Sequence, residues 1–207
     1  VGAAREFSAT ALAVAGSMVY VASLGEGVLA FDLSNLERPA RRSTWALAGI
    51  GDSLVVSGSL LFAGAFNTLA SASIAAPGQS VALGSAKVAS GRVRDIAVAG
   101  RYAYVTVGES GLRVMDVINP AAPAPVGSLT VFSYALGIAI TGTDAYVADF
   151  GRGLRIVDVS TPSAPTEIGH HNTLGHARDV AVLGRLAYVA TNTGLEIVDI
   201  SNPAAPF

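Results

Sequence analysis

The most constraining feature of this sequence is a motif that returns every 42 residues. Five glycines keep this interval: Gly16, Gly58, Gly100, Gly142 and Gly184. Four residues after each glycine comes an aromatic residue: Tyr20, Phe62, Tyr104, Tyr146 and Tyr188. A repeat in the low forties that is rich in short strands is typical of the blades of a β-propeller. The sequence therefore predicts an all-β fold made of five similar units.

The fourth copy shows the strand plan most clearly. Gly142 opens a tight turn after a first strand, A, and residues 145–148 form a second strand, B. Residues 154–160 alternate between two faces, as expected for a third strand, C. Residues 161–165 hold two prolines and form a turn, and residues 166–169 form a short outer strand, D. Each copy is thus predicted to be a four-stranded antiparallel blade.

A single domain is expected over residues 1–207. The predicted blades are approximately 10–51, 52–93, 94–135, 136–177, and 178–207 together with 1–9. The last copy ends before its strand D, whereas the opening stretch VGAAREFSATALAV is similar to the strand D, loop and strand A run VGSLTVFSYALGIAI at 126–140. We therefore expect the N-terminal strand to complete the last blade and close the ring, which removes exposed sheet edges. The alternative is an excerpt from a longer array of six or seven blades.

Composition narrows the range of partners. The net charge of −2 gives no basic face for nucleic acid or for an anionic membrane surface. No apolar run approaches the roughly 20 residues that span a bilayer, so no membrane insertion is expected. The chain has no cysteine, and hence neither a disulfide framework nor a thiolate site. The missing initial methionine suggests a processed or trimmed chain.

Three phrases carry a resemblance to a known family. GLRVMDVINPAAP, GLRIVDVSTPSAP and GLEIVDISNPAAP each follow an AYV strand core and resemble the LVIVD repeat, a propeller repeat common in bacterial and archaeal surface or exported proteins. The resemblance covers nearly the whole chain and is weakest at 63–91. It implies a propeller and an exported or cell-surface location, although it leaves a cytoplasmic one open. It implies no shared active site.

Residues that recur in every blade are expected to serve the blade, whereas a unique site requires departures from the pattern. The recurring aspartates precede turns and are expected to accept backbone N–H bonds there: Asp32, Asp116, Asp158 and Asp199. The recurring aromatic residues of strand B are expected to fill the space between blades. Unit two has lost the aspartate and is read as a drifted blade, with a low-charge face for a partner as the alternative.

The irregular residues fall on one face, which carries the B–C loops and the D–A connections. From this face we predict ligand contacts by Asp95, Glu109, Tyr134, Asp149, Phe150 and Asn192. The first functional hypothesis is a non-enzymatic binding or scaffolding propeller that presents these loops to a protein, glycan or small ligand. Asp95, Asp179 and Asp52 are expected at the mouth of the central channel, because each lies at the entry to an innermost strand.

The second hypothesis is a metal-dependent hydrolase of the lactonase or phosphotriesterase kind. All three histidines lie within seven residues, and a carboxylate follows, giving a candidate set for zinc, manganese or calcium: His170, His171, His176 and Asp179. Arg178 or Arg152 would stabilise the developing oxyanion. The alternative is that these are solvated or hydrogen-bonded loop residues. Arg94-Asp95 repeats Arg178-Asp179, which indicates a role of Asp179 in the blade.

Overall fold

The computed structural model describes residues 7–47 and 49–207, and this part of the chain forms five antiparallel sheets without any helix. The first sheet is β1 (Ala9–Ala15), β2 (Met18–Ser23), β3 (Gly27–Asp32) and β4 (Ala40–Trp45). The second is β5 (Ile50–Ser57), β6 (Leu60–Ala65), β7 (Thr68–Ser73) and β8 (Val81–Lys87). The third is β9 (Asp95–Ala99), β10 (Tyr102–Thr106), β11 (Leu112–Asp116) and β12 (Ala124–Leu129).

The fourth sheet is β13 (Ala135–Thr141), β14 (Asp144–Asp149), β15 (Gly153–Asp158) and β16 (Thr166–His171). The fifth has three strands: β17 (Ala177–Leu183), β18 (Leu186–Thr191) and β19 (Gly194–Asp199). Strands pair in sequence order within every sheet, so each sheet is one up-and-down blade, as the repeat predicts. No helix of the described residues is long and apolar enough to cross a membrane.

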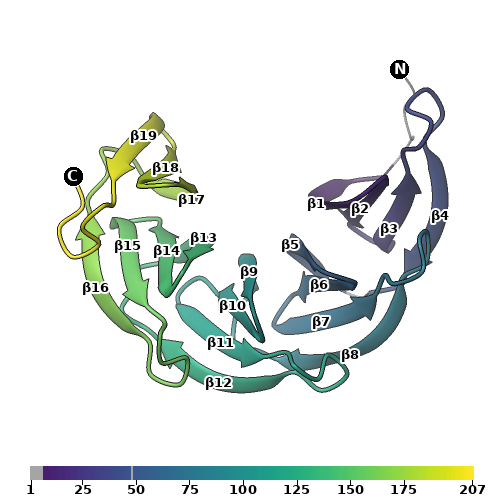
Figure 1. The fold of residues 1–207 in the computed structure, drawn as a ribbon, viewed down its shortest axis with the longest axis horizontal. Helices are drawn as coiled ribbons and strands as arrows, with labels where there is room; N and C mark the ends of the chain where they lie inside the picture. Colours follow the sequence, from purple (N-terminus) through teal and green to yellow (C-terminus); the bar gives the residue numbers. More distant parts are fainter. Residues whose placement is uncertain (1–6, 48) are drawn as a thin grey trace.

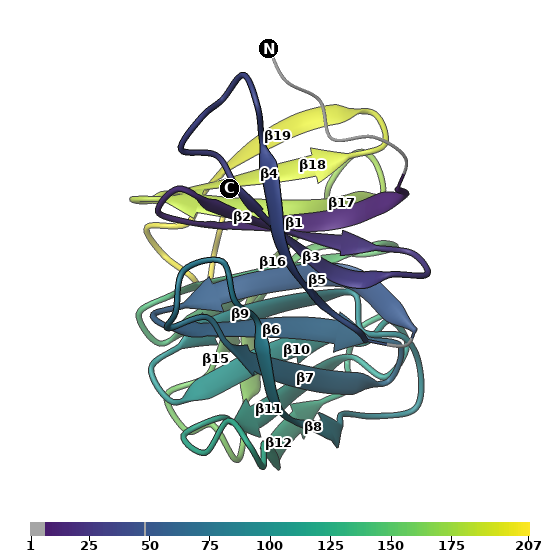
Figure 2. The same ribbon diagram turned by 90° about the vertical axis from the view of Figure 1, so that its right-hand side faces the viewer.

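The five blades stand side by side around an open arc (Figure 1). Strands β1, β5, β9, β13 and β17 form its inner side, and each contacts the inner strand of the next blade. Strands β4, β8, β12 and β16 form the outer rim. Figure 2 shows the twist of the first blade, in which β4 runs steeply across the direction of β1. Such a twist is expected of antiparallel sheets.

The arc stays open between the fifth blade and the first (Figure 1). At the edge of β19, the backbones of Asp199 and Phe207 exchange two hydrogen bonds, of 2.7 and 3.1 Å, at the position where an outer strand begins in the other blades. The predicted closing strand falls mostly on residues 1–6, outside the described residues, and Ala9 belongs to β1. Closure of the ring therefore stays a prediction.

The core lies between blades, and four of the five recurring aromatic residues fill it as predicted, whereas Tyr188 of the last blade is only partly buried. Tyr20, Phe62, Tyr104 and Tyr146 are at most 4% exposed. Each apolar cluster joins residues of two neighbouring blades, as where Tyr20 of β2 and Leu61 of β6 share one cluster. Stability of the arc thus comes from the burial of apolar side chains between adjacent sheets.

The two end blades expose the faces that are buried everywhere else. Leu12 of β1 is 66% exposed, whereas the equivalent Leu54 is 8% exposed because the first blade covers it. Likewise Ile197 of β19 is 58% exposed, whereas the equivalent Ile156 of β15 is fully buried against the fifth blade. Both ends of the arc therefore carry apolar surface of the kind that mediates blade packing.

The recurring aspartates cap the turns after the third strands, as predicted. Their carboxylates accept backbone N–H bonds of 2.7 to 2.9 Å from the residue two positions on: Ser34, Ile118, Ser160 and Ser201. Arg101 also donates to Asp116, and together with the Ile118 N–H bond it holds the pKa of that carboxyl below its usual value. The ion pair and the turn both favour the charged form.

Two details differ from, or refine, the strand plan. Strand β16 runs on to His171, so His170 and His171 belong to the outer strand and not to a loop. Unit two forms a complete blade despite its lost aspartate, which supports a drifted blade.

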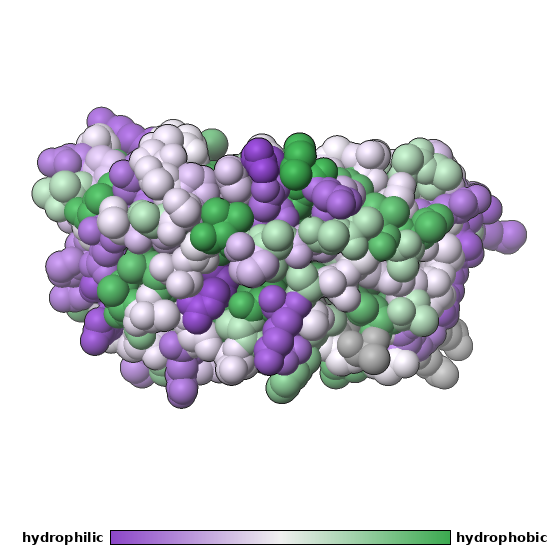
Figure 3. All heavy atoms as spheres, turned by 90° about the horizontal axis from the view of Figure 1, so that it is seen from below, coloured by the Kyte–Doolittle hydropathy of each residue, from purple (hydrophilic) through white to green (hydrophobic). Residues whose placement is uncertain are grey.

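Figure 3 views the arc from below and shows hydrophobic and hydrophilic residues interspersed on that side.

Candidate functional site

One face of the arc carries the turns between second and third strands and the connections from each outer strand to the next inner strand. We call it the loop face. Four cavities open among these segments, and each is lined by residues that depart from the repeat. The opposite face carries the turns with the capping aspartates.

The inner strands of neighbouring blades are joined at the loop face by Asp95. Its carboxylate accepts hydrogen bonds from Ser53 Oγ of β5 at 2.9 Å and from the Ile138 N–H of β13 at 3.0 Å. It also accepts the N–H of Ile96 at 2.8 Å. Burial raises the pKa of the Asp95 carboxyl, and the nearby Asp179 carboxylate acts in the same direction, whereas the three hydrogen bonds oppose the rise.

The three aspartates that were expected near one another lie close to the starts of inner strands and line the same cavity. Asp52, Asp95 and Asp179 line one cavity of about 310 Å³ together with Arg94, Leu136, Gly137 and Arg178. Asp52 is paired with Arg92 at 2.7 Å and with Arg94 at 3.4 Å. This cavity therefore mixes both signs of charge and has no strong net preference by itself.

Tyr134 occupies space that a glycine leaves free. Arg94 lies over the Tyr134 ring, 5.1 Å from its centroid, and donates a hydrogen bond to its hydroxyl. A Cβ atom on Gly108 would lie 2.9 Å from Cζ of the ring, closer than such atoms approach each other. The position equivalent to Gly108 in the fourth blade is Phe150. In the third blade this position has no side chain, and the ring of Tyr134 from the following connection lies there instead.

Phe150, His176 and Arg178 form a second aromatic group beside the first. The rings of Phe150 and His176 stack with centroids 4.2 Å apart and an interplanar angle of 11°. The guanidinium carbon of Arg178 lies 5.5 Å from the centre of the Phe150 ring. Cation–aromatic contacts of this kind hold a guanidinium group in place at an exposed site.

The two groups enclose a cavity of about 370 Å³ lined by Arg94, Tyr134, Leu136, Phe150 and Arg178, which we call the arginine–aromatic pocket. It shares Arg94, Leu136 and Arg178 with the cavity that the aspartates line. A volume in this range suits a small ligand or one unit of a larger one. The chemistry available is binding by positive charge and flat apolar surface.

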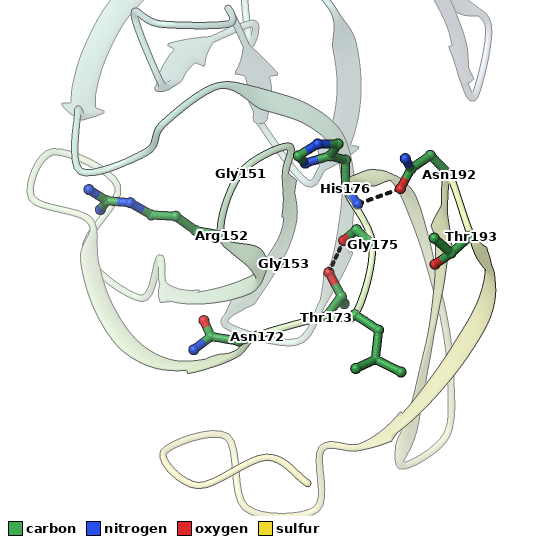
Figure 4. Close-up of a pocket in the computed structure, with 10 residues that line it drawn as sticks. Gly151, Arg152, Gly153, Asn172, Thr173, Gly175, His176, Asn192 and Thr193 are labelled. Carbon is green, nitrogen blue, oxygen red and sulfur yellow. Dashed lines mark hydrogen bonds between the residues drawn. The ribbon is translucent and has the colours of Figure 1, made fainter.

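A separate cavity of about 280 Å³ lies between the fourth and fifth blades (Figure 4). Asn192 Oδ1 accepts the backbone N–H of His176 at 2.7 Å, and Arg152 extends away from these two residues. Arg152 donates a hydrogen bond of 2.9 Å to the Val131 carbonyl. Arg152 and Asn192 thus share this cavity, away from the arginine–aromatic pocket. Glu109 lines a further cavity of about 350 Å³ beside Tyr134.

Asp149 has a structural role in place of the predicted ligand contact. Its side chain is fully buried and accepts hydrogen bonds from the Ser133 N–H at 2.9 Å, the Tyr134 N–H at 2.7 Å and the Ser133 hydroxyl. Both carboxylate oxygens are thereby used within the protein. Asp149 positions the loop that presents Tyr134, and it does not line the cavities described above.

The structure does not bring the four candidate metal ligands together. His170 and His171 lie on the outer strand β16 next to Glu167 and Glu196, at 3.9 and 4.0 Å. His176 stacks on Phe150, with Nδ1 3.0 Å from the Phe150 carbonyl oxygen, and Asp179 lies on the inner strand. Among residues 7–47 and 49–207, no group of three or more histidine, cysteine or acidic side chains is placed to hold a metal ion.

Arg94 is the principal site residue that the ligand predictions left out. Arg94 precedes Asp95 in the sequence as Arg178 precedes Asp179. This match indicated only that Asp179 has a role in the blade. The same register also places Arg94 and Arg178 two blades apart on the same face, with Leu136 between them. Reading the register by position would have identified the pair that lines the pocket.

Solved structures with a similar fold have little sequence in common with this chain. The computationally designed Ika8 protein has a TM-score of 0.75 and 12% identity, over 94% of this chain and 59% of its own. A putative 6-phosphogluconolactonase from Bacteroides uniformis ATCC 8492 has a TM-score of 0.76 and 16% identity, over 91% of this chain and 65% of its own. This chain therefore spans less than two thirds of either protein, and the likeness concerns the fold.

The search of curated proteins returned no match. The family model of the LVIVD repeat matches residues 90–131, 133–173 and 174–207, which are more than half of the chain. These three matches coincide with the third, fourth and fifth blades, where the GLxxxD phrases lie on β11, β15 and β19. The chain belongs to the LVIVD repeat family.

Proposed function

We propose that this protein is a non-enzymatic binding scaffold that holds its ligand on the loop face. The observation that supports it is the arginine–aromatic pocket, which is formed by side chains from three blades and joins Arg94 and Arg178 to the irregular residues Tyr134 and Phe150. Rigid sheets position these loops, and loops on a rigid scaffold are where binding commonly occurs. The ligand is a protein, a glycan or a small molecule that inserts a group into this pocket. The family resemblance supports an exported or cell-surface location.

The hydrolase hypothesis is not proposed, because the residues chosen for it lie apart. His170 and His171 are on the outer strand, whereas Asp179 is on the inner strand of the next blade. Arg152 and Arg178 line different cavities. The loop face therefore offers shape and charge for binding, and no other observation on it favours hydrolysis.

The proposal can be tested by mapping ligand contacts on isotope-labelled protein. Libraries of glycans, peptides and metabolites are added, and amide shifts are followed by NMR. We expect binders to shift residues of the loop face around Tyr134, Phe150 and Arg178. Shifts confined to the turns with the capping aspartates would contradict the proposal.

A matched pair of variants sharpens the test. Phe150→Ala removes a ring from the pocket, whereas Ile118→Ala removes a side chain that is 69% exposed on the opposite face. We expect Phe150→Ala to weaken binding about tenfold, since loss of a contact ring costs about 1–3 kcal/mol. Ile118→Ala should leave affinity unchanged, and equal effects of the two would also contradict the proposal.

A further inference from the structure

We propose that the arginine–aromatic pocket takes an organic monocarboxylate with a flat, apolar body, such as an aromatic acid, and that Arg178 is its anchor. This inference rests on the proposed binding function and names the ligand class for the same pocket. Four features of the described residues support it: the lack of a carboxylate partner for Arg178, the aromatic walls, the size of the cavity and the position of the aspartates.

Arg178 is a positive charge without a carboxylate partner in the described part of the chain. Seven other arginines have a carboxylate within 4 Å: Arg41, Arg42, Arg92, Arg94, Arg101, Arg155 and Arg185. Arg178 lies over the face of Phe150, and within residues 7–47 and 49–207 its guanidinium group makes no hydrogen bond or ion pair, so its N–H groups remain available at the pocket. A guanidinium group matches a carboxylate in two parallel hydrogen bonds, which makes carboxylate its preferred partner.

The walls of the pocket select a flat body. Tyr134 and Phe150 contribute rings, and Leu136 lies between the two arginines in the repeat register. Aromatic rings attract other flat groups by stacking and by burial of apolar surface. The volume of about 370 Å³ leaves room for a ring system and excludes a large folded partner from the interior.

The neighbouring aspartates limit the charge of the ligand. Asp95 and Asp179 line the adjoining cavity, and Asp52 is already paired with Arg92 and Arg94. A dianion such as a phosphate ester would be repelled by these carboxylates, whereas a single carboxylate can bind Arg178 while its neutral body lies against the rings. The pocket is thus expected to prefer monocarboxylates to phosphates and to neutral analogues.

The experiment measures binding of 2-naphthoate and of 2-naphthamide, its neutral analogue of the same shape, to the whole chain by NMR titration. We expect the acid to bind and the amide to bind at least about tenfold more weakly, because the amide cannot form the charged bidentate pair. Naphthyl phosphate serves as the dianion and is also expected to bind more weakly than the acid. Equal affinity of acid and amide would overturn the proposal.

Variants locate the anchor. Arg178→Gln should weaken 2-naphthoate about tenfold and leave the amide unchanged. Arg152→Gln is the matched control on the same face, since Arg152 lines the separate cavity, and it should change affinity less than twofold. Equal loss in both variants would overturn the role of Arg178. If Arg178→Gln fails to fold, the comparison of acid and amide on the unmodified chain decides the question alone.

The outcomes separate this inference from the broader proposal. If the amide binds as tightly as the acid, shifts the same residues and loses affinity in Phe150→Ala, the pocket is a binding site and the carboxylate assignment is wrong. If neither compound nor any library member shifts residues of the loop face, the binding function itself is contradicted.

Discussion

The Asp95 carboxylate accepts the backbone N–H of Ile138 on the inner strand of the next blade, at 3.0 Å. Through Ser53 it also holds the inner strand of the preceding blade, at 2.9 Å. The Asp95 side chain therefore links three consecutive blades at the loop face, where it also lines a cavity. The shape of this cavity depends on that link.

Replacing Asp95 is expected to destabilise the protein more than replacing its partner. Asp95→Ala leaves the Ile138 and Ile96 N–H groups without their acceptor, and we expect a loss of about 2–4 kcal/mol in the free energy of unfolding. Ser53→Ala removes one donor and should cost about 1 kcal/mol. Urea denaturation of both variants measures the difference. Equal, small losses would show that the link contributes nothing.

The open arc predicts that one substitution costs much more stability at one of two equivalent positions than at the other. Ile156 is fully buried, so Ile156→Ala should cost about 2–5 kcal/mol in unfolding free energy. Ile197 is 58% exposed, so Ile197→Ala should cost no more than about 0.5 kcal/mol. Denaturant unfolding curves at low protein concentration give the unfolding free energy of both variants. A large cost at Ile197 would indicate that the ring is closed and would support the predicted N-terminal strand.

The charge of the turn aspartates predicts a dependence of stability on pH. The Arg101 partner and the Ile118 N–H lower the pKa of folded Asp116, so its contribution is present above the unfolded value of about 3.9 and is lost as the pH falls through the lower folded value. Asp116→Asn keeps an oxygen for the turn but removes the charge. Thermal melts from pH 7 to pH 2 should show the variant less stable at pH 7 and the gap closing in acid. A gap that stays constant with pH would rule out the ionisation as its cause.

Alanine substitutions at Gly108 and Gly142 distinguish the cost of steric crowding from the cost of backbone strain. Both have positive φ, +50° and +61°, but a Cβ on Gly108 meets the Tyr134 ring, whereas a Cβ on Gly142 meets nothing within 4 Å. Gly142→Ala should cost about 1–2 kcal/mol for the left-handed backbone alone. Gly108→Ala should cost more and should also shift the NMR signals of the Tyr134 ring. Identical costs and an unmoved ring would show that Tyr134 adjusts freely.

The sequence was sufficient for the blades because their determinants are local and periodic. Tyr20 and three of its four equivalents fill the core, and Asp116 and its equivalents cap turns two residues away, so the repeat interval alone identifies their roles. Asp149 could not be assigned in this way, since its partners, Ser133 and Tyr134, lie 15 to 16 residues away on another loop. His170 and His171 were misplaced because strand β16 is longer than its turn signals indicate.

The space above Gly108 has a consequence for how such proteins diversify. When a gene segment is duplicated in tandem, all copies begin with the same surface, and one way for a copy to diverge is to lack a side chain that another copy has. Here a missing side chain in the third copy makes room for Tyr134 from the linker that follows, without disturbing any strand. A glycine at a single turn can thus make room for a side chain from another loop, which offers protein engineers a simple route to differentiate identical modules.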